Sequence, residues 1–267
     1  MGTSQDAYES FCDELWRDWL ADRLARSAFV GGDFDSERAP EPWLELRAGL
    51  QPLVALTTNP GGGMKHQLRD EILRGRSVIT PTDSYRAATA GLPHFYETYP
   101  TLAGSAARRR ITALLRLSEL AGYDGVLQVE SCPFHSARLP NKPALVRASK
   151  GNGLLGTYTE HLRQFLKRRP VVSVSAVSSR APLSREHVLS EWLVWQATLM
   201  GLEPGRARFV PLVKKEGDGT TAAALVSSVR GIPRALVLMM GGNHLPAERG
   251  LAKLAIELKA TAGARAG

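Results

Sequence analysis

Cysteine and long apolar stretches are scarce in this sequence of 267 residues. The only cysteines are Cys12 and Cys132, which excludes a disulfide framework and is typical of the reducing cytoplasm. No apolar run approaches the ~20 residues that span a bilayer, and the N-terminal residues lack the pattern of a signal peptide. No cysteine and histidine cluster has the spacing of a zinc site. We therefore expect a cytoplasmic protein with no membrane segment, no metal and no other cofactor.

Positive charge is in excess, with a formal net charge of +8. Short basic clusters occur at Arg108–Arg110, Lys167–Arg169 and Lys214–Lys215. Such a balance favours a phosphate-bearing partner, DNA or a nucleotide-like ligand, because binding releases counterions. The alternative is an arginine-rich solvated surface without a partner.

Strand-like and helix-like segments alternate along the chain. The apolar or alternating runs predict strands at 52–56, 125–129, 171–177, 207–213 and 235–240. Helical spacing predicts helices at 6–26, 65–75, 104–121, 157–169, 184–201 and 247–260. Residues 76–102 have neither pattern. This alternation predicts one α/β domain over 1–267, with helices on both faces of a central, mostly parallel sheet.

Three of the predicted strands end in motifs of polar residues and glycine. TTNPGGG (57–63) follows the first strand, ESCPFHS (130–136) the second and GGNHLP (241–246) the last. In open α/β sheets, ligands bind at the carboxyl ends of the strands. We therefore expect Asn59, Glu130, His135, Asn243 and His244 to meet in one crevice.

The side chains in these motifs suit a polar, ring-shaped ligand. Asn59 carries a donor and an acceptor, so it can orient a water molecule, and Phe134 can form one face of a ring pocket. Glu130 follows an apolar run, so it should be partly buried and need a partner. The alternatives are an ordinary Asn-Pro-Gly turn and a surface histidine at His135. For Cys132 we favour a small core residue over a nucleophile.

Two of the motifs resemble those of a known superfamily. TTNPGGG resembles the GxNPG motif of the uracil-DNA glycosylase superfamily, and ESCPF is similar to the second-strand motif of its single-strand-selective branch. The resemblance covers roughly residues 50–140, with a looser match at 235–250. It implies a three-layer α/β/α sandwich around a parallel sheet, and hydrolysis of the N-glycosidic bond of an altered base, uracil or a related one, flipped out of DNA.

The resemblance also implies roles for individual residues. Asn59 would position the water, and Glu130 stands where the family has a base-reading asparagine. In a glycosylase-like reaction, His244 or His135 would stabilise charge on the leaving base. The other substrate-binding residues would be Thr58, Pro60, Gly61, Phe134, His135 and Asn243. The sequence departs from the family at Glu130, because a carboxylate offers only acceptors. The terminal His-Pro-Ser motif is absent, and 171–230 has no counterpart, which predicts an insertion.

Two other functions stay open at this point. One is a non-catalytic nucleic-acid or nucleotide-binding protein on the same fold. The other is an NADP-dependent enzyme, because GNGLLG (151–156) fits a dinucleotide-binding fingerprint if ALVRAS (144–149) is a strand. Arg180 would then contact the 2′-phosphate. Without that strand, GNGLLG is a glycine-rich loop that enters the next helix.

Overall fold

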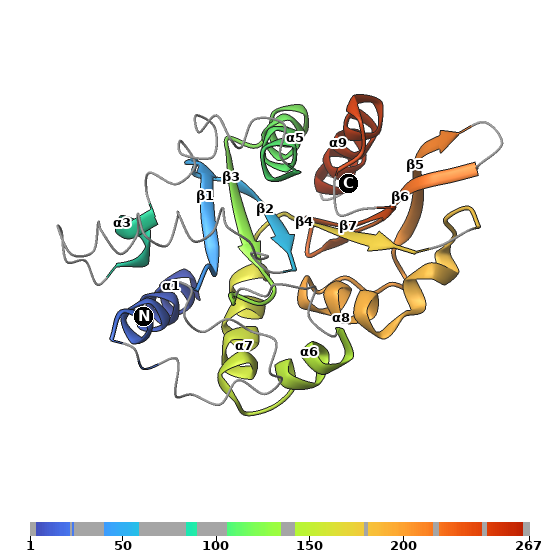
Figure 1. Ribbon diagram of the computed structural model, residues 1–267. Helices are drawn as coiled ribbons and strands as arrows, with labels where there is room; N and C mark the ends of the chain where they lie inside the picture. The colour runs from blue at the N-terminus through green and yellow to red at the C-terminus, as the bar shows by residue number, and fades with distance from the viewer. Residues whose placement is uncertain are drawn as a thin grey trace. The chain divides into compact units, whose positions relative to one another are not determined.

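The structure, a computed structural model, describes residues 4–21, 23, 40–58, 84–89, 106–134, 142–178, 181–215, 219–241 and 245–263. Within these residues, seven strands form one sheet in the order β1-β3-β2-β4-β7-β6-β5 (Figure 1). The strands are β1 (Trp43–Arg47), β2 (Pro52–Thr57), β3 (Gly125–Glu130), β4 (Val171–Val177), β5 (Arg208–Lys215), β6 (Gly219–Val229) and β7 (Ile232–Met240). The helices are α1 (Ser4–Leu20), α3 (Tyr85–Thr89), α5 (Ala106–Ala121), α6 (Lys142–Ser149), α7 (Leu154–Leu166), the 3-10 helix η3 (Arg185–Leu189), α8 (Glu191–Leu199) and α9 (Glu248–Gly263).

The sheet is mixed, with a parallel core. Leu56 of β2 pairs with Ser173 of β4, and Ser173 pairs with Leu236 of β7, all in parallel register. β6 runs antiparallel to both β7 and β5. The expectation of an α/β protein is confirmed, but the sheet is less parallel than expected.

The two strands at the other edge are β1 and β3. The Glu130 N–H donates to Pro42 O at 2.9 Å, so the end of β3 meets the start of β1 and the two strands are antiparallel. A two-residue turn joins β6 to β7, with Arg230 at φ 55° and Gly231 at φ 77°. Positive φ at both positions matches the twist of a hairpin and favours glycine at the second.

The chain divides into two compact units. The first comprises Met1–Leu44, Thr58–Leu92 and Val129–Phe165, and the second Glu45–Thr57, Pro93–Gln128 and Leu166–Gly267. In the first, α1 packs on α7: the rings of Tyr8 and Phe165 lie 4.5 Å apart, and those of Phe11 and His161 lie 4.7 Å apart. In the second, α8 contacts β4 through a hydrogen bond that Ser175 Oγ of β4 donates to Gln196 Oε1 of α8. Figure 1 shows α9 on the opposite face of these strands.

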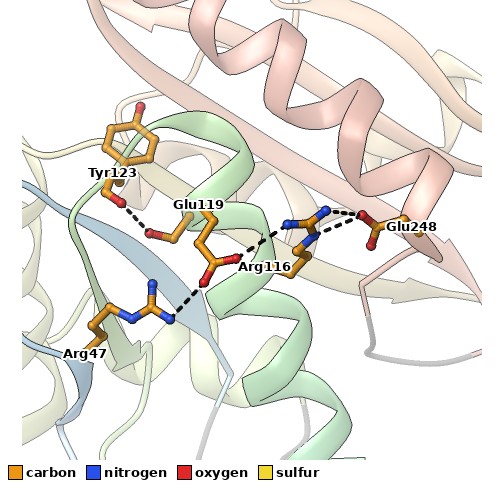
Figure 2. Close-up of polar contacts among 6 residues, drawn as sticks. Arg47, Arg116, Glu119, Tyr123 and Glu248 are labelled. Carbon is orange, nitrogen blue, oxygen red and sulfur yellow. Dashed lines mark hydrogen bonds and ion pairs between the residues drawn. The ribbon is translucent and has the colours of Figure 1, made fainter.

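Helices α5 and α9 pack side by side in the second unit and share a chain of ion pairs (Figure 2). Arg116 of α5 contacts Glu248, the first residue of α9, at 2.9 Å and Glu119 at 3.5 Å. Glu119 also accepts from Arg47 of β1 at 3.0 Å. Hydrogen bonding to Arg47 lowers the pKa of Glu119. All of these groups are exposed or half-exposed, so the pairs orient the two helices more than they stabilise the fold.

Several elements differ from the sequence prediction. The helix predicted at 6–26 is α1, which ends at Leu20, and the helix predicted at 184–201 breaks at Ser190 into η3 and α8. Ser190 caps α8 by accepting from the Leu193 N–H. Strands β1 and β6 were not predicted. The run 171–230 supplies β4, β5 and β6 to the sheet, and its interpretation as an insertion stays a prediction.

The NADP-dependent alternative requires a strand at 144–149, but these residues belong to helix α6. Pro143 in the first turn presets the helical φ and lacks an amide hydrogen that the helix would leave unpaired. Leu145, Val146 and Ser149 are buried, at helical spacing. GNGLLG therefore joins two helices, and a side chain on Gly156 would clash with Gly151 O. The strand that a dinucleotide-binding fingerprint requires is absent before it.

Within the second unit, a fully buried arginine joins the start of β7 to the carbonyls of residues 166–169 and to the end of α8. The Arg234 guanidinium donates to backbone carbonyls at the ends of α7 and α8 and next to itself, namely those of Leu166, Lys167, Arg169, Met200 and Pro233. Burial lowers the pKa of Arg234 to about 10. A cation at a helix C-terminus is favourable, and five carbonyls use all five donors of the guanidinium.

Replacing Arg234 with lysine should lower the free energy of unfolding by at least about 3 kcal/mol, because buried carbonyls lose their donors. Arg206→Lys is the matched control, since Arg206 is 84% exposed in its ion pair with Glu203. The control should change stability by less than about 0.5 kcal/mol. Urea unfolding of both variants measures the difference, and equal stabilities would contradict the assigned role of Arg234.

Candidate functional site

The carboxyl ends of β2 and β3 meet. The Cys132 N–H, two residues beyond β3, donates to the carbonyl of Thr58, which directly follows β2, at 2.9 Å. The two strands are neighbours in the sheet, and since their carboxyl ends lie together they are parallel. The prediction that the strands ending at Leu56 and Val129 are adjacent and parallel is confirmed. The first two motifs therefore lie side by side where the structure describes them.

Two tyrosine hydroxyls hold the end of β3 from the helices of the first unit. The Tyr158 hydroxyl of α7 donates to Glu130 O at 2.6 Å. The Tyr8 hydroxyl of α1 lies 3.1 Å from that of Tyr158 and 3.2 Å from Pro42 O. Burial raises the pKa of both tyrosines well above the usual range, so both hydroxyls keep their protons. This neutral network fixes the backbone from which the Glu130 side chain projects.

The residues after β3 are buried. Glu130 is 1% exposed and Phe134 is 3% exposed, and Ser131 and Cys132 between them are also buried. Burial raises the pKa of Cys132 to about 12, and the charge of Glu130 adds to the increase. The same charge contributes to the raised pKa of Tyr158. Glu130 is thus a buried acid close to both groups, and Cys132 is a neutral core thiol without nucleophilic character.

Three of the predicted site residues belong to the described part of the chain. Thr58 is half-buried, and Glu130 and Phe134 are buried in the same unit. The remaining predicted residues lie outside the described residues, namely Asn59, Pro60, Gly61, His135, Asn243 and His244. The convergence of all three motifs in one crevice therefore stays a prediction. Gly241, the first residue of the third motif, follows β7 with φ 80°.

Sequence reasoning missed the roles of Tyr8 and Tyr158. Neither residue belongs to the three motifs from which the site was predicted. A signal was present, because a tyrosine on the buried face of a helix needs a partner for its hydroxyl. The partners are backbone carbonyls, which leave no mark in the sequence.

The described residues give no indication of a bound metal. Among them, no group of three or more histidine, cysteine, aspartate or glutamate side chains is arranged to hold an ion. In the same residues, no helix has the length and apolarity needed to cross a membrane. No protein-family model, curated protein or solved structure matches the chain.

Both cysteine thiols should be unreactive in the native protein. Burial raises the pKa of Cys12 well above its usual range and that of Cys132 to about 12, so neither forms thiolate near neutral pH. Ellman's reagent at pH 8 should detect no rapidly reacting thiol in native protein and two per chain in guanidinium chloride. The Cys12→Ser variant, with one thiol in denaturant, assigns the signal. Rapid labelling of native Cys132 would show that the end of β3 is open to solvent.

Proposed function

We propose that this protein is a DNA glycosylase-like hydrolase that cleaves the N-glycosidic bond of an altered base, on a three-layer α/β/α sandwich. The observation that carries the proposal is the hydrogen bond from the Cys132 N–H to Thr58 O. It brings together the ends of the two strands that bear the NPG and CPF segments, as the resemblance requires. The absence of a disulfide at Cys12 and Cys132 suits a cytoplasmic protein.

The proposed reaction needs a water, a base pocket and a group that stabilises the leaving base. Asn59 holds the water that adds to C1′ of the sugar, and the bond from C1′ to the base nitrogen breaks with its electrons passing to the base. A proton released by the water neutralises the base, and His244 stabilises its charge meanwhile. Phe134 lies beside the base, with Thr58, Pro60, Gly61, His135 and Asn243 completing the pocket. Positioned groups of this kind are typically worth a hundredfold or more in rate.

In this proposal, the Glu130 side chain selects which base the pocket accepts. A buried carboxylate offers acceptors only, whereas the edge of uracil presents an N–H donor between two carbonyl acceptors. The proposed pocket therefore favours a base with two neighbouring donors over uracil itself. The fixed backbone of Glu130 supports this role, since its N–H donates to the Pro42 carbonyl and its own carbonyl accepts from the Tyr158 hydroxyl.

Asn59→Ala should lower base release at least about a hundredfold and change the free energy of unfolding by less than about 1 kcal/mol. The assay is alkaline strand cleavage after incubation with oligonucleotides that carry uracil, hypoxanthine or other altered bases. Asn152→Ala, which truncates an exposed asparagine outside the motifs, is the control and should keep full activity. If the unaltered protein releases no base, the enzymatic proposal fails.

Glu130→Gln should shift the preference toward uracil, because an amide supplies both a donor and an acceptor. Glutamine keeps the size of the side chain, so the shape of the buried site is retained. The measurement is the ratio of uracil release to release of an amino-bearing base, for the variant and the unaltered protein. An unchanged ratio would show that Glu130 does not contact the base.

A second candidate is a non-catalytic protein that binds nucleic acid or a nucleotide on the same fold. The burial of Glu130 and Phe134 favours it, since a site that admits a flipped base must expose these groups at some stage. The two candidates differ in one measurement, because only the first releases a base. The NADP-dependent alternative loses its support, because α6 stands where its strand was expected.

A further inference from the structure

The cluster Lys167–Arg169 lies at the end of the sheet where the parallel strands begin. It joins the end of α7 to the start of β4 at Val171. The Val54 N–H, near the start of β2, donates to Pro170 O at 2.9 Å. Arg234, near the start of β7, binds the carbonyls of Lys167 and Arg169. This cluster is therefore anchored at the amino edge of the parallel strands.

The cluster Arg108–Arg110 lies toward the opposite edge. Helix α5 ends three residues before Asp124, whose carboxylate accepts from the Leu50 and Gln51 N–H groups just before β2. The C-terminus of α5 is thus at the amino edge, and its N-terminus points to where the strands end. Arg116 contacts the first residue of α9, the helix that follows β7. Arg108–Arg110 lie roughly 9–12 Å further toward the N-terminus of α5, at 1.5 Å per residue.

Lys214 and Lys215 lie at the same edge as Arg108–Arg110. They end β5, which runs in the direction of β7 because both are antiparallel to β6. Both lysines are exposed, as are Arg108 and Arg109. From β2 to β5 the sheet order counts four strand spacings, which is about 19 Å at ~4.8 Å each. The carboxyl edge therefore carries positive charge at two places, and the distance between them covers several phosphates of a DNA strand.

The charges of Arg109 and Arg110, near the start of α5, are not compensated by an ion pair within the described residues. The helix dipole favours acidic residues and disfavours cations in the first turn of a helix. The first turn of α5 nevertheless holds no acidic residue. Among the residues that the structure describes, Arg109 and Arg110 make no ion pair, and Arg110 Nε is buried without a hydrogen-bond acceptor. Glu248, the acid at the nearby end of α9, pairs with Arg116. An external anion would complete this arrangement.

We infer that Arg108–Arg110 and Lys214–Lys215 bind the phosphate backbone of DNA along the carboxyl edge of the parallel strands, and that Lys167–Arg169 does not. The inference rests on the proposed function, which makes DNA the partner. It distinguishes basic clusters that the sequence alone leaves equivalent. Exposure does not distinguish them either, since Arg108 and Arg109 are exposed and so are Lys167 and Arg168. The strands separate the two edges by about 20 Å, so a backbone that runs along the carboxyl edge does not lie against the amino edge.

Two double variants that remove equal charge test this assignment. Arg108→Ala/Arg109→Ala and Lys167→Ala/Arg168→Ala each remove two positive charges from exposed positions. Binding is measured by fluorescence anisotropy with a labelled 24-nucleotide single strand and its duplex, at 50 and 200 mM NaCl. The arginine pair should weaken binding about tenfold at 50 mM and reduce the salt slope by about two. The lysine-arginine pair should weaken binding less than about twofold.

Equal losses for the two variants would overturn the assignment while leaving DNA as a partner. Failure of the unaltered protein to bind either DNA at 50 mM NaCl would overturn it together with the DNA form of the proposed function. Binding is measured apart from base release. A protein that shows the expected pattern and releases no base therefore supports this surface and contradicts catalysis alone.

Discussion

A guanidinium buried among backbone carbonyls is the constraint on which the larger unit depends. Arg234 stands near the start of β7, and its donors reach carbonyls at the ends of α7 and α8. Charge buried in this way is tolerated only when every donor is used, since desolvating an ion costs several kcal/mol. The start of β7, the residues before β4 and the end of α8 must therefore keep one arrangement. That arrangement sets the register of the parallel core and, with it, the level at which the strands end.

The fold could be predicted where burial leaves a pattern in the sequence. The apolar runs before Leu56 and Val129 identified β2 and β3 as neighbouring buried strands, and the glycine after α5 identified its end, with Gly122 at φ 83°. β6 was missed because its buried run begins with three alanines, which have little preference for strands and are held there by β5 and β7. The sequence left open whether ALVRAS, now in α6, is a strand, because a short apolar run does not distinguish the two structures. Only the proline in its first turn points to a helix.

The sequence likewise predicts part of the candidate site and misses the rest. Position along the chain was enough to place Thr58 and Glu130 at neighbouring strand ends, because parallel strands bring their carboxyl ends together. It was not enough to show that Glu130 is buried among tyrosine hydroxyls, since Tyr8 and Tyr158 come from helices 150 residues apart. Their partners are main-chain atoms, and a main-chain acceptor can belong to any residue. Site residues that follow one strand are thus easier to predict from the sequence than the supporting residues on distant helices.

The hairpin of β6 and β7 has a consequence for how genes for such proteins can change. Every pair from Val229 with Ile232 to Ala222 with Met239 follows from the two-residue turn at Arg230 and Gly231. Side chains alternate between the faces of a strand, so one added or deleted codon at the turn would shift the register by one residue. Arg234 would then lose its carbonyls, and the buried side chains of β7 would exchange the faces on which they pack. Descendants of this sequence can vary the residues of that turn, while its length is inherited unchanged.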